Sequence, residues 1–452
     1  SMRPILQSEK ATEELKDMEH QLVFRLYRGS GMPYKSGSNV PIQSKIEVSF
    51  AGQTTSSSAI SNAKEPSYNE EFGISYIKYG HQRHVEEEIQ VRLLDVSNET
   101  PETEGPIAGM FRHGTVVDEL VGRTSIDMST VVQFPSTKYR EMKKLKDDKF
   151  SKELKSNGAK PIWLNFYGAS TSGTKDGATE QMNKGEKLGS DFRGRILVQV
   201  YSVSAKDYHK KSDEGTRIQS KKVNSSLSLV KQIAPCRDPG TESFTLRCDL
   251  YQGFGFPDLM GPYKLEAHLQ VDGSSSERLV AEVKPNAGAE RKSHAKWMQR
   301  FKELCVTLPK NPRDIPNAYL YIYVIQNGQR ERLGFISLDL GSGKFPFNHN
   351  EPYWMPLQPD PLSAKYNAQR RGKDIQTDQP MPKVIGQLQC RVEFGVSGLA
   401  PERPKMRGSQ GNKWDLRAFV YQARDLPVET DLFPDPYVEF KLGRSTKRSK
   451  II

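Results

Sequence analysis

The stretch LVFRLYRGSGMP, Leu22 to Pro33, decides the fold because the chain repeats it twice, as LRCDLYQGFGFP over 246–257 and as LRAFVYQARDLP over 416–427. All three copies obey Leu-x3-[Leu/Val]-Tyr-x4-[Met/Phe/Leu]-Pro without a gap. The residues alternate along each copy, which predicts a β-strand, and the final proline ends it because proline has no amide hydrogen to donate. Three copies at fixed spacing predict three modules that open with the same strand.

A second pattern repeats near the end of the first two modules. Each has a tryptophan in a short apolar stretch, at Pro161–Phe166 and at Pro352–Leu357, and each continues after a polar insertion with an alternating run, at Gly194–Tyr201 and Gly386–Phe394. Alternating strands bounded by Gly and Pro, with few helical patterns between them, are typical of antiparallel β-sandwiches. The sequence therefore predicts an all-β fold of tandem antiparallel sandwiches with long polar loop insertions and one or two short helices.

Domain boundaries follow from these repeats. The predicted parts are a helical lead-in at 1–19, a complete sandwich at 20–201, a linker at 202–243, a second sandwich at 244–395, a linker at 396–413, and the opening strands of a third sandwich at 414–452. So short a third part cannot bury a sandwich core, so we expect that module to continue beyond Ile452. Helices are predicted at Ser8–Glu19 and at about Ser136–Leu154, and polar loop insertions at 168–191 and 363–384.

Composition limits the class of protein. A chain of 452 residues, 35% hydrophobic and 27% charged, fits a soluble protein of two or three domains. No stretch approaches the ~20 apolar residues that a membrane span needs. The four cysteines form no C-x-x-C pair, which argues against a zinc ribbon or a disulfide framework and favours a reducing, cytosolic setting. The net charge of +11 favours an acidic partner surface, such as phosphate-bearing lipid or nucleic acid.

The third module carries a family resemblance. A first strand with Tyr421, a Leu-Pro pair, an acidic loop and then Asp-Pro-Tyr-Val at 435–438 resembles the C2 domain, a β-sandwich whose apical loops meet membranes. Taken in order, four stretches are similar to the middle of a ferlin: Ile46–Gln53, Glu65–Glu70, Trp163–Ala169 with the later Lys184–Glu186 and Phe192–Tyr201, and Leu416–Tyr437. Ferlins are large tail-anchored proteins with several C2 domains, linked to calcium-triggered vesicle fusion and membrane repair.

The resemblance implies an order of parts. It matches the third C2 domain of a ferlin, a linking β-rich region and the opening of the fourth, and across 244–395 only the strand skeleton agrees. The helical central region that animal ferlins place before the fourth domain has no counterpart here. This departure suggests a divergent, protist member of the family.

Calcium chemistry follows from the loops of each module. A C2 domain gathers six to eight oxygens for Ca²⁺ from two apical loops with about five acidic residues. Where the family has D-P-[FY]-V-E-V-S-F, this chain has Gln43-Ser-Lys-Ile-Glu-Val-Ser-Phe50, and its second loop keeps Asp95 but has Ser97 at the next ligand position. In the second module Gly261 replaces an Asp, and 324–328 holds no carboxylate. We expect both complete modules to be calcium-independent, with Asp95 capping its own loop backbone.

The third module keeps half of a site. Glu429 and Asp435 stand six residues apart, as the first-loop ligands of the family do, with Asp431 between them. The second acidic loop would lie beyond Ile452. Calcium is therefore expected as a cofactor only in a complete third module, and the alternative is a surface turn built on Asp-Pro.

Basic residues provide the candidate lipid contacts, because a row of ammonium groups can engage several phosphates. The candidates are Lys441, Arg444, Lys447, Arg448 and Lys450 after the Asp-Pro-Tyr motif, and Lys143 and Lys144 in the segment 138–146. That segment can form a basic amphipathic helix at a membrane. The preferred interpretation is a solvated helix with Tyr139, Met142 and Leu145 packed on its own domain.

Motifs for other functions are missing. Leu340–Lys344 lacks phosphate-loop spacing, Gly253-x-Gly255 precedes Phe-Pro instead of a helix, and the eight histidines form no catalytic or metal motif. No enzyme activity and no nucleic-acid binding are expected, the latter because the basic residues lack interleaved aromatics.

The expected function is that of a non-enzymatic ferlin segment in calcium-regulated vesicle fusion and exocytosis. Its calcium-independent modules would bind or space anionic phospholipid membranes and vesicle-fusion proteins at the cytoplasmic face of a vesicle or the plasma membrane. Two alternatives stay open: a protein–protein adaptor without lipid contact, and the regulatory C2 region of a lipid-modifying enzyme whose catalytic domain lies outside this chain.

Overall fold

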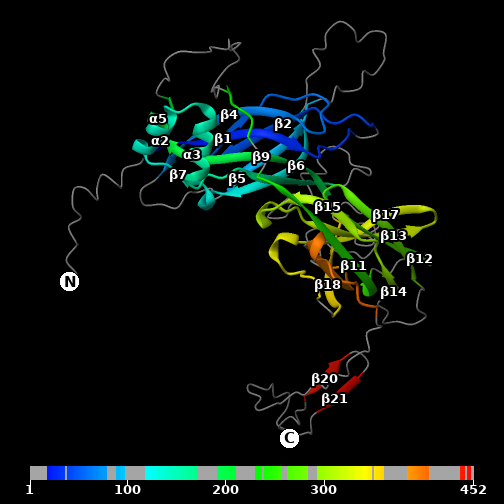
Figure 1. Ribbon diagram of the computed structural model, residues 1–452. Coiled ribbons are helices and arrows are strands. Elements are labelled where there is room, and N and C mark those ends of the chain that lie inside the picture. Colours follow the sequence, from blue (N-terminus) through cyan, green and yellow to red (C-terminus); the bar gives the residue numbers. More distant parts are fainter. Residues whose placement is uncertain are drawn as a thin grey trace, which may run out of the picture. The chain divides into compact units, whose positions relative to one another are not determined.

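The computed structural model describes most of the chain (Figure 1). The described residues are 18–35, 38–78, 88–96, 118–169, 191–209, 230–236, 239–256, 262–283, 293–348, 351–360, 384–406, 438–442 and 445–448. The chain divides into two compact units, Ser1–Met406 and Arg407–Ile452. Each unit is described by itself.

The first sandwich lies in unit 1. Its strands are β1 (Met18–Ser30), β2 (Ser44–Phe50), β3 (Gln53–Ser56), β4 (Ser67–Lys78), β5 (Glu88–Asp95), β6 (Glu119–Asp127), β7 (Val132–Gln133), β8 (Ile162–Gly168), β9 (Asp191–Ser204) and β10 (Lys231–Gln232). They pair in the order β10-β4-β1-β9-β8-β6-β5-β2-β3, with β7 parallel to β9. Strands β6 and β8 share a single registered pair, Arg123 with Tyr167. The strand order therefore divides at this point into the two packed faces of the sandwich. Between these faces lies a core that includes Phe24, Val91 and Phe166.

Short helices cover one outer face of this sandwich. They are α2 (Ser136–Lys143), α3 (Asp147–Ser156) and α5 (Ala205–His209). The 3-10 turn η1 (Met128–Thr130) instead places Met128 in the core between the faces. Tyr139 and Met142 of α2 and Phe150 of α3 form a buried cluster with Val23 and Tyr201 of β1 and β9. Burial of this apolar face, more than helix propensity, stabilises such short helices.

Two helix predictions differ from the structure. The helix predicted at 136–154 is two helices, since α2 ends at Lys143 and α3 begins at Asp147, whose carboxylate suits a helix N-terminus. Leu145 falls between them and is exposed, so the prediction that it packs beside Tyr139 is wrong. The helix predicted at Ser8–Glu19 is wrong at its end, because Met18 and Glu19 begin β1, and its remainder lies outside the described residues.

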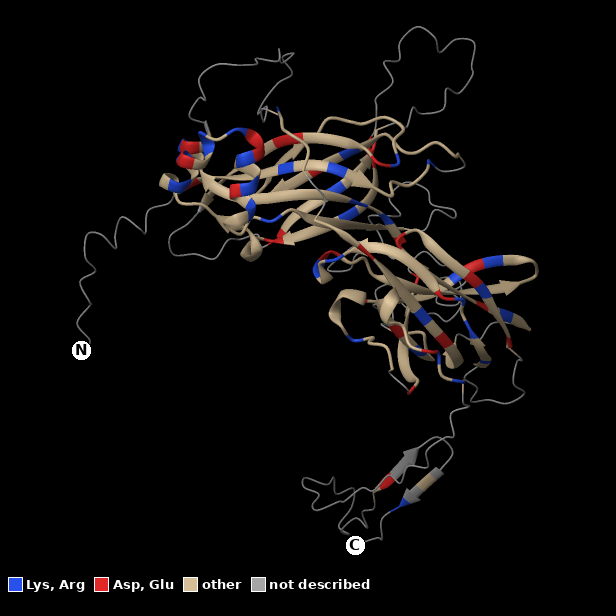
Figure 2. Cartoon of the chain, in the orientation of Figure 1, with Lys and Arg blue, Asp and Glu red and all other residues tan. Residues whose placement is uncertain are grey.

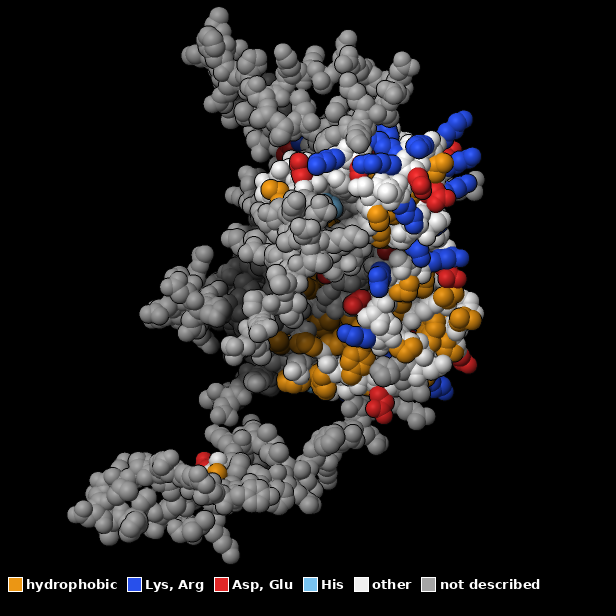
Figure 3. All heavy atoms as spheres, turned by 90° about the vertical axis from the view of Figure 1, so that its left-hand side faces the viewer, with side chains coloured by type: hydrophobic (Ala, Val, Ile, Leu, Met, Phe, Trp, Pro, Cys, Tyr) orange, Lys and Arg blue, Asp and Glu red, His pale blue; other side chains and the backbone are white. Residues whose placement is uncertain are grey.

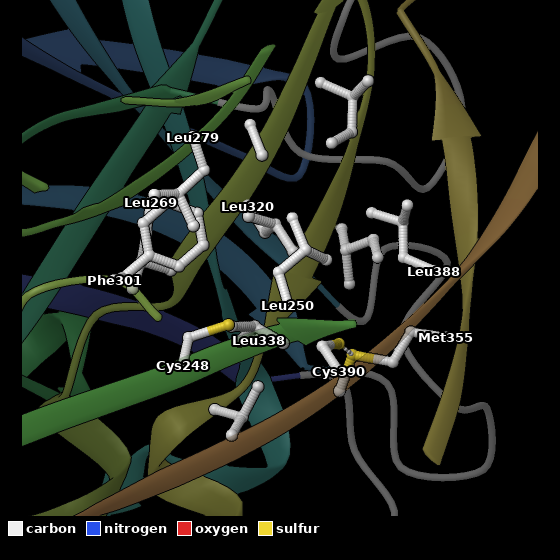
Figure 4. Close-up of a cluster of buried hydrophobic side chains, with 14 of the residues drawn as sticks. Cys248, Leu250, Leu269, Leu279, Phe301, Leu320, Leu338, Met355, Leu388 and Cys390 are labelled. Atoms are coloured by element: carbon white, nitrogen blue, oxygen red, sulfur yellow. Dashed lines mark hydrogen bonds between the residues drawn. The ribbon is translucent and has the colours of Figure 1, made fainter. Parts of the chain in front are cut away.

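The second sandwich also lies in unit 1. Its strands are β11 (Thr241–Phe256), β12 (Tyr263–Val271), β13 (Ser274–Val283), β14 (Ser293–Arg300), β15 (Leu304–Pro309), β16 (Ala318–Gln326), β17 (Gln329–Leu338), β18 (Tyr353–Pro359) and β19 (Gly386–Val396), with 3-10 turns η2 (Pro312–Asp314), η3 (Leu340–Ser342) and η4 (Ser397–Leu399). The pairing order is β13-β12-β16-β17-β18-β19-β11-β14, with β15 also on β11. Its core contains two buried thiols, Cys248 and Cys390, among leucines and Phe301 (Figure 4).

The repeated strand motif has a common geometry in both sandwiches. The pairing register shifts between Leu26 and Arg28 in β1, and between Leu250 and Gln252 in β11, so the motif tyrosine forms a β-bulge in each. The glycine four residues after that tyrosine takes positive φ in both, 71° at Gly31 and 78° at Gly255. In both sandwiches the motif therefore forms a strand with a β-bulge at its tyrosine, followed by a glycine in the left-handed backbone conformation.

Side chains of the two sandwiches form one shared cluster. Tyr167 of β8 is buried with Tyr319 of β16 and Phe335 of β17, and the rings of Tyr167 and Tyr319 lie 5.8 Å apart, edge to face. The Tyr167 hydroxyl accepts a hydrogen bond from the Asn317 amide at 2.9 Å. At the β12–β13 turn, Asp272 lies 3.4 Å from Arg195 of β9. The two modules thus bury apolar and ionic groups against each other.

The segments expected as linkers contain ordered elements. Residues 202–243 include the end of β9, α5, β10 and the start of β11. Residues 396–406 lie on the second sandwich, where Arg403 donates to the carbonyls of Cys248 and Phe301 at 2.8 and 2.9 Å. Unit 2, within its described residues, holds the hairpin β20 (Glu439–Leu442) and β21 (Ser445–Arg448).

Candidate functional site: apical loops and basic surface

The apical loops of the first sandwich use their polar groups internally. Asp95 is buried, and its carboxylate accepts a hydrogen bond from the Gln43 amide at 3.0 Å. Ser44 is fully buried and accepts a hydrogen bond from the Tyr68 hydroxyl at 2.7 Å. Lys45 places its ammonium 2.7 Å from Asp118. Asp95 therefore caps backbone, but the prediction that it caps its own loop is wrong for this hydrogen bond, because the Gln43 amide belongs to the other loop. Ser97 lies outside the described residues.

The second sandwich has a minimal connection at the matching place. Strands β16 and β17 are joined by the two residues Asn327 and Gly328, with φ of 52° and 75°, between the paired Gln326 and Gln329. Positive φ at both positions is the geometry of a type I′ hairpin turn, which Asn-Gly favours. Such a turn offers amide and carbonyl oxygens but no carboxylate. Gly261 lies outside the described residues.

Metal-binding side chains do not gather elsewhere in the described ranges. Within them, no three His, Cys, Asp or Glu side chains converge to hold a metal ion. The predicted ligands Glu429, Asp431 and Asp435 lie outside those ranges. Their calcium role stays a prediction.

Candidate lipid contacts in unit 2 are only partly described. Lys441 lies in β20 and Lys447 in β21, while Arg444 and Lys450 fall outside the described residues. Arg448 is exposed and lies 2.6 Å from Glu439 on the paired strand. Of this set, only Arg448 has a described side chain, and it is ion-paired.

The helical layer of the first sandwich carries both charges, with lysines in excess of the exposed Glu141, Asp148 and Glu153 (Figure 2). Six exposed lysines on and between α2 and α3 define what we call the lysine surface: Lys138, Lys144, Lys146, Lys149, Lys152 and Lys155. Figure 3 faces this side of the molecule and shows Lys and Arg side chains gathered there. Leu145, 38% exposed, lies between two of the lysines. A cationic surface with an exposed apolar residue suits contact with an anionic membrane.

The two predicted lysines of this segment have different surroundings. Lys144 is exposed and belongs to the lysine surface. Lys143 donates hydrogen bonds to the carbonyls of Asp207 and Tyr208 at 3.1 and 2.8 Å. Its partial burial lowers the pKa of the ammonium below its usual value. Lys143 therefore ties α2 to α5.

An exposed aromatic pair was missed by the sequence analysis. Phe254 of β11 and Trp354 of β18 are 36% and 40% exposed, and their rings meet edge to face with centroids 4.9 Å apart. The matching tryptophan of the first sandwich, Trp163, is buried between Arg28 and Arg195, whose guanidinium carbons lie 5.4 and 5.3 Å from the ring centroid. At the matching positions the second sandwich has Gln252 and Gln387 in place of these two arginines. This difference in sequence could have predicted that Trp354 is more exposed than Trp163.

Comparisons with known proteins agree with this architecture. The family model of the C2 domain matches residues 20–147 and 414–452. No curated protein matches the chain. The fold class predicted from the sequence is confirmed: antiparallel C2-type β-sandwiches with few helices.

Solved structures of C2-domain proteins resemble the chain at low identity. The tandem C2 domains of Extended-Synaptotagmin 2, calcium bound, are 12% identical with a TM-score of 0.23, over 84% of this chain and 97% of that chain. A single C2 domain of plant Extended Synaptotagmin 1 is 11% identical with a TM-score of 0.23, over 42% and 97%. Human GIVD cytosolic phospholipase A2 is 11% identical with a TM-score of 0.22, over 83% and 32%. C2 domains of this kind commonly bind membranes and lipids. No helix in the described ranges is both long and apolar enough to cross a bilayer.

Proposed function

We propose that this chain is a non-enzymatic segment of a ferlin-like protein of vesicle–membrane fusion, and that its first sandwich binds anionic phospholipid without calcium. The lysine surface carries the proposal. Six exposed ammonium groups within one helical layer attract a negatively charged leaflet, by about 1 kcal/mol per lysine near the surface. The site of action would be the cytoplasmic face of a vesicle or the plasma membrane.

Calcium independence is supported by the loop geometry. In the first sandwich the carboxylate of Asp95 already accepts the Gln43 amide, and the carboxylate of Asp118 is ion-paired with Lys45. In the second, the β16–β17 connection has only Asn327 and Gly328. Since Ca²⁺ requires several carboxylate oxygens, the described parts of these loops offer an inadequate ligand set in both modules. Calcium sensing would then belong to a completed third module.

Vesicle sedimentation tests the proposal. The full chain is expected to sediment with vesicles containing phosphatidylserine, equally with calcium or with a chelator, and to be released by high salt because screening weakens surface attraction. A triple variant, Lys144→Glu, Lys149→Glu and Lys152→Glu, should reduce the bound fraction about tenfold or more, since it reverses three charges of the lysine surface.

The matched control is Lys264→Glu on β12, an exposed lysine that already faces Glu282 at 3.5 Å. It should bind like the parent protein. Binding that needs calcium, or that survives the triple variant unchanged, would contradict the proposal.

A further inference from the structure

The first sandwich holds an extended segment of its own chain on one sheet edge. In β10, Lys231 pairs with Glu71 and Gln232 with Glu70 of β4. The next residue, Ile233, donates its amide to the Asn69 carbonyl at 2.8 Å. Its side chain is buried in a cluster with Tyr27, Trp163 and Leu197. A strand edge and an adjacent tryptophan face thus bind an extended peptide together.

Strand β14 of the second sandwich is the counterpart of β4. Glu70 is registered with Leu26 immediately before the bulged tyrosine of β1, and Gln299 with Leu250 at the same point of β11. The preceding residues, Asn69 and Met298, share a left-handed backbone with φ of 51°. Trp354, on β18 of the same sheet and separated from β14 by β19 and β11, is the counterpart of Trp163.

Met298 adopts the left-handed backbone conformation, which is uncommon for a bulky side chain. A bulky residue with positive φ is sterically unfavourable, and such residues persist where the fold requires them. In β4 the same kink turns the Asn69 carbonyl toward the bound segment. Met298 repeats the kink, yet among the described residues no strand pairs with the outer edge of β14. Within the described ranges, the outer edge of β14 therefore has no strand partner, and Phe254 and Trp354 are partly exposed on the same sheet.

Charge distinguishes the two edges. The β4 edge is acidic, with Glu70 and Glu71, and it receives Lys231. Strand β14 contains no acidic residue, and its corresponding residues are Gln299 and Arg300, with His294 and Lys296 exposed further along. Arg300 lies 3.7 Å from Asp249 and donates to the Pro404 carbonyl, so Lys296 is the exposed cation of this edge without an ion pair among the described contacts. An incoming strand with an acidic residue at the position of Lys231 would complement this edge.

We propose that the outer edge of β14 and the Phe254–Trp354 face form a β-strand addition site for an acidic, extended segment of a partner protein. Main-chain hydrogen bonds to β14 would hold the segment, and an apolar side chain two residues after the acidic one would lie on Trp354, as Ile233 lies on Trp163. The aromatic face supplies affinity and the basic strand supplies charge selectivity.

A pair of peptides tests the site on the full chain. The probe copies residues 230–236 with Lys231→Glu and Cys236→Ser and carries a fluorophore; the comparison peptide keeps the lysine. Fluorescence anisotropy should show the acidic peptide binding roughly tenfold tighter than the lysine peptide, because only the former complements β14. Equal binding of both peptides, or no binding of either, would overturn the proposal.

Variants assign the peptide to the site. Combined Phe254→Ser and Trp354→Ser should weaken the acidic peptide by roughly tenfold or more, and combined Lys296→Glu and Gln299→Glu should reverse the preference between the peptides. Val280→Ser, at an exposed valine of β13, is the matched control and should change nothing. The combined Phe254→Ser and Trp354→Ser variant could instead lose binding to phosphatidylserine vesicles and bind the acidic peptide as before. The aromatic face would then be a lipid contact, and the strand-addition site would be refuted.

Discussion

At the scale of single residues, the two complete sandwiches bury opposite charges at the same motif position. Arg25 in β1 is fully buried, lies 3.2 Å from Glu71 across the strand pair and contacts Asp147 of α3. Asp249 occupies the matching position of β11 and contacts Arg391 and Arg403. In each case a segment outside the core strands supplies a counter-charge. The inversion shows that the position requires a neutralised pair, and does not require a particular sign.

Removal of one partner tests this requirement. Asp249→Ala would leave buried guanidinium groups without a counter-charge, which should lower the free energy of unfolding by about 3–5 kcal/mol. Urea denaturation measures it. Lys264→Ala, at an exposed ion pair, is the comparison and should change stability by less than about 1 kcal/mol. If Asp249→Ala lowered the free energy of unfolding by less than about 1 kcal/mol as well, the charge cluster around Asp249 would be solvated instead of buried.

The Asp272 carboxylate predicts a pH dependence. Burial raises its pKa from 3.8 to about 6, and the nearby Arg195 only partly opposes the shift. Between about pH 4 and 6 the folded protein holds a proton that the unfolded chain has lost, so this group makes stability fall as pH rises through that window. Asp272→Asn imitates the protonated form and tolerates the φ of 47°.

The variant should therefore be more stable than the parent at pH 7.5, by about 1–3 kcal/mol, and equal to it near pH 4. Chemical denaturation at a series of pH values gives both curves. A constant difference between the two proteins across the series would rule out titration of Asp272 in this window.

At the scale of elements, the strand motif was predictable and its additions were not. The repeated Leu–Tyr–Pro pattern identified β1 and β11, because alternation and proline act locally. The division of 136–154 into α2 and α3 depends on packing against Tyr201, a residue far along the chain. Strand β10 is only two residues long and lay in a predicted linker. Such elements depend on tertiary contacts that no local pattern encodes.

The bulged opening strand gives a prediction of its own. A Cβ added at Gly253 would lie 2.6 Å from both Leu388 and Phe256, closer than real contacts allow. Gly253→Ala should therefore destabilise the second sandwich by about 1–3 kcal/mol through overpacking. Gly398→Ala, where nothing lies within 4 Å, is the control. Equal midpoints in thermal unfolding for the two variants would disprove the crowding argument.

At the scale of the whole molecule, the sequence predicted two complete sandwiches but not their contact. Tyr167 and Tyr319 lie far apart in the chain, and each looks like an ordinary strand residue. The candidate site was partly predictable as well: Lys144 was named from the basic run, whereas the exposure of Trp354 depends on the glutamines that replace arginines around it. Contacts of this kind join residues of two modules, so the local pattern of neither module predicts them.

Loss of the shared cluster should uncouple the modules. Tyr167→Ala removes a buried ring and the acceptor of the Asn317 amide, which should cost about 3 kcal/mol or more and split one unfolding transition into two. Differential scanning calorimetry resolves the transitions. Tyr34→Ala, at a tyrosine 47% exposed, should leave a single transition. Two transitions already present in the parent protein would mean that the contact couples nothing.

The two-residue turn between β16 and β17 has an evolutionary consequence. Exchanging Asn327 or Gly328 for aspartate would add charge, yet two positions cannot encircle an ion that needs six to eight oxygens. A calcium loop at this tip would require inserted backbone. Point changes within a connection of this length therefore cannot add a calcium loop to this tip, whichever module of the protein senses the ion.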